Sequence, residues 1–136
     1  MTLITLAFAP EMEDAIIAGK KCCTTRREKH GEVGDLFVVR DRVYRICHIH
    51  HCLLYSARDG YYDAEGFEFP GDFEEFWATN VERFDHSKIV HLHFFAYIGP
   101  TGYYDKCMGC PIFETDAEGH CDRIFDEKGY HCEVRI

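Results

Sequence analysis

The stretch "AGKKCCTTRREKHGEVGD", residues 18–35, gathers five cations and two adjacent cysteines in a chain whose net charge is −9. Gly19 stands where a preceding helix can end, and the small and β-branched residues after it favour an extended strand through Arg26. Side chains two residues apart share one face of a strand. We therefore expect the Thr24 hydroxyl and the Arg26 guanidinium to point the same way, with the Lys21 ammonium reaching them from the bend. This group of donors suits an anion or a polarised carbonyl; the alternative is a solvated basic loop.

The composition indicates one compact domain with a small appendage, because the chain has 136 residues, of which 46% are hydrophobic and 15% aromatic. Its charge is uneven: residues 1–60 hold nine Lys and Arg against eight Asp and Glu, whereas residues 61–136 hold six against sixteen. A polyanionic partner is therefore expected to meet the N-terminal half, since phosphate contacts need cations. A large non-specific DNA footprint is not expected.

The N-terminus, "MTLITLAFAPEMED", has no basic leader before its short apolar segment and does not resemble a signal peptide. No apolar run approaches the roughly 20 residues that span a bilayer. The sequence thus predicts a cytoplasmic protein without a membrane partner. In that compartment the eight cysteines are expected to be thiols or metal ligands.

Hydrophobic patterning predicts an α+β domain over residues 1–100, with a curved, barrel-like sheet and two short helices. A polar and aromatic loop is expected over residues 59–70, and the segment 52–57, "CLLYSA", is expected either to continue the preceding strand or to follow it as a separate piece. Asp72 is expected to cap the second helix, whose stripe of Phe73, Phe76 and Trp77 is expected to pack in the core. The strands are expected at residues 2–8, 21–26, 36–40, 42–50 and 88–98, and the helices at 10–19 and 71–80.

Four segments, in order, resemble the ASCH domain family, whose members are relatives of the PUA fold. "GKKCCTTR" (residues 19–26) is similar to the family signature G-x-K-x-x-T-x-R. "VGDLFVV" (33–39) is similar to its Gly-Asp turn entering a strand, "AEGFEFPGDFEEFW" (64–77) to its Glu-Gly-Phe segment before an aromatic helix, and "KIVHLHFF" (88–95) to its closing strand. The resemblance covers roughly residues 3–98.

This resemblance implies a small PUA-like β-barrel with helices beside a cleft, an RNA-binding surface and, in some members, hydrolysis. One branch of the family removes the acetyl group from N4-acetylcytidine, and another cleaves RNA. The lysine, threonine and glutamate of the amidohydrolase branch fall here on Lys21, Thr24 and Glu65, with Arg26 as an anion contact.

These groups also fit the chemistry of amide hydrolysis, which needs a nucleophile, a base and a donor for the developing oxyanion. Thr24 can attack or position water. Lys21 can act as the base only where burial or neighbouring cations favour its neutral form. Glu65 can orient the lysine or accept a hydrogen bond from a cytosine amino group. The competing interpretation is that all of these residues are solvated or structural.

Further ligand contacts are expected from Lys20 and from the rings near Glu65 in the middle loop. Tyr61 and Tyr62 can stack on a base, as aromatic residues do in recognition of single-stranded RNA. Phe67 borders the same carboxylate. The alternative is that these rings pack in the core.

The C-terminal residues 101–136 contain Cys-x2-Cys-x10-Cys-x10-Cys, a spacing that favours a structural zinc site closed by a hairpin. His120 or His131 can replace the cysteine that follows it. An iron–sulfur cluster, free thiols and disulfides remain alternatives. The expected zinc ligands are Cys107, Cys110, Cys121 and Cys132.

A second run of soft ligands, "CHIHHC" (residues 47–52), alternates along a predicted strand. His48, His50 and Cys52 are expected on one side, which permits a metal, although such residues are more often half-buried strand positions. His91 and His93 are expected to line the surface of the barrel.

Together these observations predict a domain that binds RNA or a modified nucleoside in a cleft around Lys21, Thr24, Arg26 and Glu65. One alternative is a hydrolase acting on N4-acetylcytidine or on RNA. The other is an adaptor that docks a protein partner through its metal-binding tail.

Overall fold

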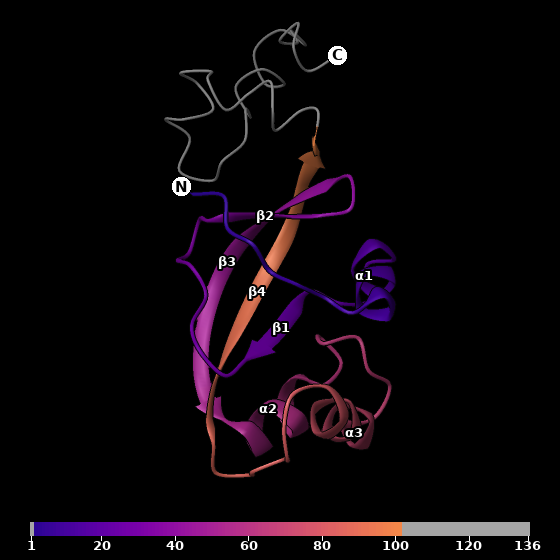
Figure 1. The fold of residues 1–136 in the computed structure, drawn as a ribbon, viewed down its shortest axis with the longest axis vertical. Helices are drawn as coiled ribbons and strands as arrows, with labels where there is room; N and C mark the ends of the chain where they lie inside the picture. Colours follow the sequence, from indigo (N-terminus) through magenta and orange to yellow (C-terminus); the bar gives the residue numbers. More distant parts are fainter. Residues whose placement is uncertain (1, 102–136) are drawn as a thin grey trace, which may run out of the picture.

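The computed structural model of the chain describes residues 2–101, which form three helices and four strands. The strands form one antiparallel sheet in the order β1-β4-β3-β2. Figure 1 shows β3 and β4 as two long strands side by side, with α2 and α3 together at one end. The elements are α1 (Pro10–Ile17), β1 (Cys23–Arg26), β2 (Leu36–Val39), β3 (Arg42–Leu53), α2 (Leu54–Tyr61), α3 (Pro70–Asn80) and β4 (Ile89–Pro100).

The sheet curls because its two central strands are long and irregularly paired. β3 and β4 pair from Leu53↔Ile89 to Arg42↔Pro100, with shifts of register that mark bulges, and bulges bend and twist a strand. The N-terminal segment continues the curl beyond β2 through a parallel bridge between Leu3 and Leu36. The strand predicted at residues 2–8 is thus wrong, since only this single bridge forms there.

Two other predictions about elements are corrected. Residues 54–61 form helix α2, where the sequence predicted a strand or a loop. Helix α3 begins at Pro70, one residue earlier than predicted, and its N-cap is Phe69 with no side-chain cap. Asp72 is in the first turn, where its carboxylate can only complement the helix dipole.

Two clusters of buried side chains form the core of the described residues. One joins α1 to β2, β3 and β4, and the other joins α2 and α3 to the sheet. In the second cluster Phe73 and Trp77 are each 3% exposed, as predicted for the aromatic stripe, whereas Phe76 is only half-buried. The first cluster comprises Leu6, Ile16, Phe37, Val39, Tyr44, Ile46 and Phe95, and the second Cys23, Leu54, Ala57, Phe73, Trp77, Val90 and Leu92.

The predicted α+β class is therefore confirmed, with a curled four-stranded half-barrel and three helices in place of two. The predicted hairpin extension lies outside the described residues, except for Thr101. Within the described residues no helix is long and apolar enough to span a membrane.

Candidate functional site

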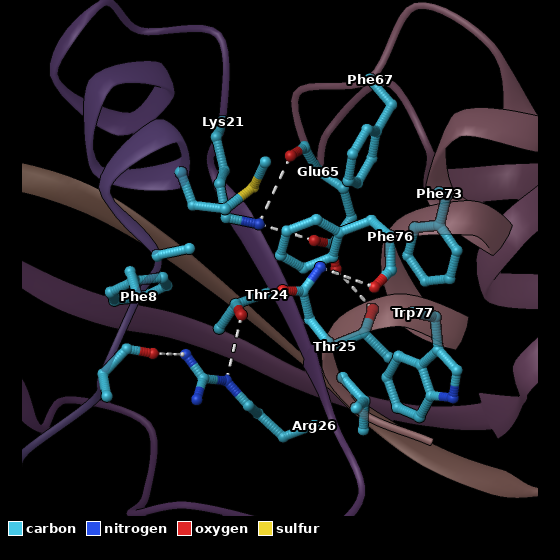
Figure 2. Close-up of a pocket in the computed structure, with 15 residues that line it drawn as sticks. Phe8, Lys21, Thr24, Thr25, Arg26, Glu65, Phe67, Phe73, Phe76 and Trp77 are labelled. Atoms are coloured by element: carbon cyan, nitrogen blue, oxygen red, sulfur yellow. Dashed lines mark hydrogen bonds and ion pairs between the residues drawn. The ribbon is translucent and has the colours of Figure 1, made fainter. Parts of the chain in front are cut away.

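A cavity of about 310 Å³ opens between the segment before α1, strand β1, the loop before α3 and α3 itself. Figure 2 shows a polar wall, from β1 and the loop, facing an aromatic wall from the loop and α3. The polar side chains are Lys21, Thr24, Thr25, Arg26 and Glu65, and the rings are Phe8, Phe67, Phe73, Phe76 and Trp77. The four residues expected to surround a cleft thus line one cavity.

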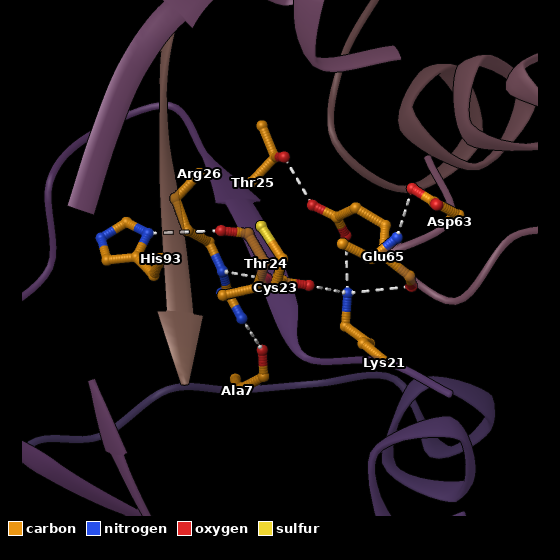
Figure 3. Close-up of polar contacts among 10 residues, drawn as sticks. Ala7, Lys21, Cys23, Thr24, Thr25, Arg26, Asp63, Glu65 and His93 are labelled. Carbon is orange, nitrogen blue, oxygen red and sulfur yellow. Dashed lines mark hydrogen bonds and ion pairs between the residues drawn. The ribbon is translucent and has the colours of Figure 1, made fainter. Parts of the chain in front are cut away.

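Lys21 lies at the bend between α1 and β1, and its side chain is only 2% exposed. Helix α1 ends before Gly19, whose φ of 79° turns the chain toward the strand. The Lys21 Nζ donates to the Cys23 carbonyl at 2.7 Å, the Glu65 carbonyl at 3.3 Å and Glu65 Oε2 at 2.6 Å (Figure 3). Three acceptors match the three N–H donors of an ammonium, so this geometry is that of a charged lysine.

Glu65 reaches the cavity from a tight turn in the loop before α3. The next residue, Gly66, has a φ of +93°, and a Cβ there would lie 3.2 Å from the Cβ of Lys21. Glycine permits both the backbone conformation and this close approach. The Glu65 carboxylate accepts from Lys21 through one oxygen and from the Thr25 hydroxyl, at 2.5 Å, through the other. The carboxylate is therefore held at both oxygens.

Thr24 and Arg26 share a face of β1, as strand alternation predicted. Arg26 Nε donates to Thr24 Oγ1 at 3.1 Å, and Nη2 donates to the Ala7 carbonyl at 2.7 Å. The guanidinium also lies over the Phe8 ring, 4.9 Å from its centroid. Burial lowers the pKa of Arg26, an effect that nearby Glu65 opposes. Within residues 2–101, Nη1 has no hydrogen-bond partner, which leaves donors for an anion.

His93 on β4 lies opposite Thr24 of the neighbouring strand β1. The expectation that it lines the surface is wrong, since it is fully buried. Its Nε2 accepts from the His30 backbone N–H at 2.9 Å, and its Nδ1 lies 3.3 Å from the Thr24 carbonyl. Burial lowers the pKa of His93 to about 4. A neutral ring that accepts at Nε2 donates from Nδ1 to that carbonyl, so His93 fixes the backbone that carries Thr24.

Three other predicted contacts are not brought to the cavity. Lys20 is exposed and does not line it, and neither does Tyr61 or Tyr62. Both tyrosines pack against the second core cluster, and the Tyr61 ring lies 5.6 Å from that of Phe94. This position follows from α2, because the helix directs its last turn toward the sheet.

Sequence reasoning missed Thr25 and most of the aromatic wall. Alternation placed Thr25 on the opposite face from Thr24, but β1 is an edge strand, and the cavity reaches both of its faces. The stripe of α3 was assigned to the core, yet its rings are both core and cavity wall. In the loop, only Phe67, which lies next to the Glu-Gly turn, indicated from the sequence that an aromatic wall is present.

The histidine-rich stretch of β3 is arranged in pairs. The His48 and His50 rings stack at 6.3 Å, and the His51 ring lies 6.3 Å from that of His91 on β4. Within the described residues no group of three or more His, Cys, Asp or Glu side chains is placed to hold a metal ion. The expected zinc ligands, Cys107, Cys110, Cys121 and Cys132, lie outside this part of the chain.

The sequence matches none of the family models and none of the curated proteins with which it was compared. Protein EF3133 from Enterococcus faecalis, described under family DUF984, is similar in structure, with a TM-score of 0.50 and 13% identity over 77% of this chain and 80% of that chain. The ASCH domain from Lactobacillus crispatus (TM-score 0.49, 15% identity, 71% and 78%) was also found. A mutant of ZmASCH from Zymomonas mobilis is a third similar structure, with a TM-score of 0.49 and 15% identity over 72% of this chain and 68% of that chain.

At these identities a structural likeness concerns the fold alone, and here it rests on the EF3133 protein. The described part of the chain thus shares the fold of the EF3133 protein, and this likeness of fold agrees with the resemblance predicted from the sequence.

Proposed function

We propose that this protein binds RNA or a modified nucleoside, with one base held in the cavity around Lys21, Thr24, Arg26 and Glu65. The observation that carries the proposal is that this cavity joins a polar wall to an aromatic wall. A nucleobase has the matching chemistry, because its faces stack on rings and its edge exchanges hydrogen bonds.

The size of the cavity supports a ligand of nucleoside size. Its volume of about 310 Å³ is near the lower limit of small-molecule sites, which span roughly 300–1,000 Å³. A longer strand would therefore insert one unit and keep its neighbours outside.

The polar wall supplies both kinds of hydrogen-bonding partner. The Glu65 carboxylate can accept from an exocyclic amino group, and Arg26 retains donors for a carbonyl or an anion. The buried ion pair between Lys21 and Glu65 holds these groups in position before a ligand arrives, which lowers the entropic cost of binding.

Calorimetric titration with cytidine and N4-acetylcytidine tests the proposal, using Phe76→Ala to remove one ring of the aromatic wall. Base stacking is worth about 1–3 kcal/mol per ring, so the variant should bind roughly 5- to 150-fold more weakly. Phe69→Ala is the matched control, because Phe69 precedes the same helix, is 64% exposed and does not line the cavity. Absence of binding by both nucleosides and by RNA, or equal affinities of Phe76→Ala and Phe69→Ala, would contradict the proposal.

A second candidate function, hydrolysis of an acyl group from the base, is favoured by the hydrogen bond between Thr25 and Glu65. A hydroxyl that donates to a carboxylate has the arrangement of a nucleophile and its base. Thr24, which the family resemblance assigns as the working hydroxyl, instead accepts from Arg26. Lys21, whose three N–H groups all donate to protein acceptors, would then hold Glu65 in position, and Nη1 of Arg26, which is unpaired within the described residues, would donate to the developing charge.

Release of acetate from N4-acetylcytidine tests this candidate. Thr25→Val and Thr24→Val keep the side-chain shape and each remove one hydroxyl. Loss of turnover in the first variant only would assign the nucleophile to Thr25, and loss in the second only would assign it to Thr24. Binding of the nucleoside without release of acetate would contradict the hydrolytic function.

A further inference from the structure

A second cavity of about 450 Å³ adjoins the first, and the two share a wall. Thr25, Arg26, Trp77 and Val81 line both cavities. The two cavities are therefore neighbours, and a ligand seated in the first would have the second beside it.

The lining of the second cavity is cationic, although the chain as a whole is acidic. Among the described residues, its lining contains three cationic residues, Arg26, Arg27 and Lys88, but only one carboxylate, that of Glu28. His30 also lines it. Arg27 follows β1 and Lys88 precedes β4, so the cations come from segments about 60 residues apart. The fold thus concentrates positive charge beside the candidate base site.

Arg27 and Lys88 are linked by one carboxylate but remain accessible. Glu82 Oε1 lies 3.1 Å from the Nζ of Lys88 and 3.9 Å from the Nε of Arg27. The Arg27 side chain is 58% exposed and that of Lys88 is 34% exposed. Ion pairs of this exposure contribute little, so both cations are free to contact an incoming anion.

In a nucleotide the sugar joins the base to a phosphate, which must lie beside the pocket that holds the base. We propose that the second cavity, which we call the phosphate cavity (Arg26, Arg27, His30 and Lys88), binds a phosphate group attached to the base-bearing ligand. This inference rests on the proposed function and makes it narrower, since the ligand is then a nucleotide or one unit of an RNA strand rather than a free nucleoside.

The test compares four probes by calorimetric titration: N4-acetylcytidine, its 3′-monophosphate, its 5′-monophosphate and the trinucleotide uridine–N4-acetylcytidine–uridine. At low salt we expect at least one phosphorylated probe to bind about tenfold more tightly than the nucleoside, as a charge-assisted hydrogen bond provides. The two monophosphates distinguish the side on which the phosphate is attached. A further gain with the trinucleotide identifies an RNA strand, rather than a mononucleotide, as the source.

Variants then assign this gain to the phosphate cavity. The double variant Arg27→Ala and Lys88→Ala should bring the ratio of phosphorylated-probe to nucleoside affinity close to one. It should also flatten the salt dependence, by about 0.7 in log–log slope for each phosphate that the protein no longer neutralises. Glu82→Gln should raise the ratio, because it removes the competing carboxylate. Arg83→Ala is the control, because Arg83 is exposed, lies like Lys88 between α3 and β4, and lines neither cavity. Its ratio of phosphorylated-probe to nucleoside affinity should equal that of the wild-type chain.

The outcomes separate this inference from the proposed function. If the nucleoside binds and no phosphate improves its affinity, the phosphate cavity is wrong and the base site stands. If a phosphate improves affinity equally in the wild-type chain and in the double variant, the phosphate binds elsewhere and its assignment to the phosphate cavity is wrong. If none of the four probes binds, both proposals fail.

Discussion

At the scale of single residues, the site depends on an ion pair that is almost completely buried. The side chains of Lys21 and Glu65 are 2% and 6% exposed, and their charged atoms lie 2.6 Å apart. Removing one partner of such a pair costs about 3–5 kcal/mol, because the other charge stays buried without compensation. Replacing Lys21 alone therefore tests folding as much as function, which is why hydroxyl and ring substitutions are the sharper probes of this cavity.

His93 predicts how stability depends on pH. Its pKa of about 4 in the folded chain lies below the ordinary value of 6.5, so between these values the unfolded chain binds a proton that the folded chain does not. The stabilisation is present above pH 6.5 and decreases as the pH falls toward 4, by roughly 3 kcal/mol in all. Urea unfolding of the wild-type chain and of His93→Gln, between about pH 7 and 4.5, measures this change.

The difference in free energy of unfolding between the wild-type chain and His93→Gln should shrink on acidification, because only the wild-type chain carries the buried imidazole. His48→Gln is the control, since His48 is exposed and its removal should leave the wild-type pH slope unchanged. Identical slopes for the wild-type chain and His93→Gln would contradict the assignment of a buried neutral ring.

At the scale of the elements, those with a strong pattern were predicted and those defined by tertiary contacts were not. The helix after Pro10, the strand pair joined at Asp41 and the long closing strand follow from proline, turn residues and runs of β-branched and aromatic side chains. Helix α2 has only Leu54 and Ala57 buried and contains Gly60, so its sequence has little helical periodicity. The N-terminal segment is extended but lacks a strand partner along most of its described length.

The turn at Gly66 joins the middle loop to the site, and it predicts a difference between two glycines. Gly66→Ala should lower the free energy of unfolding by about 1–3 kcal/mol, because its φ of +93° strains an L-residue and the new methyl group crowds Lys21. Gly60→Ala, in α2 with open space around it, should be neutral or raise stability by up to about 1 kcal/mol. Chemical denaturation of both variants checks the prediction, and equal effects would contradict it.

At the scale of the whole molecule, the site is predictable where a local pattern encodes it and hidden where the curl of the sheet creates it. Lys21, Thr24 and Arg26 are close in sequence, and their convergence follows from a helix end and a strand. The approach of Glu65 was expected through the family resemblance. The aromatic wall and the phosphate cavity depend on the packing of α3 and the loop before β4 against β1, which no local pattern specifies.

The cysteine-rich segment, residues 101–136, supplies the last prediction. Its spacing of Cys107, Cys110, Cys121 and Cys132 predicts one tetrahedral zinc ion per chain, and few aliphatic residues are available there to form a core without it. Elemental analysis of protein purified without added zinc should give about one equivalent of zinc. Cys110→Ser should lose the metal, whereas Cys47→Ser, at an exposed position of β3, should retain it. Retention in Cys110→Ser, or loss in His120→Ala with retention in Cys121→Ser, would show that the ligand set is different.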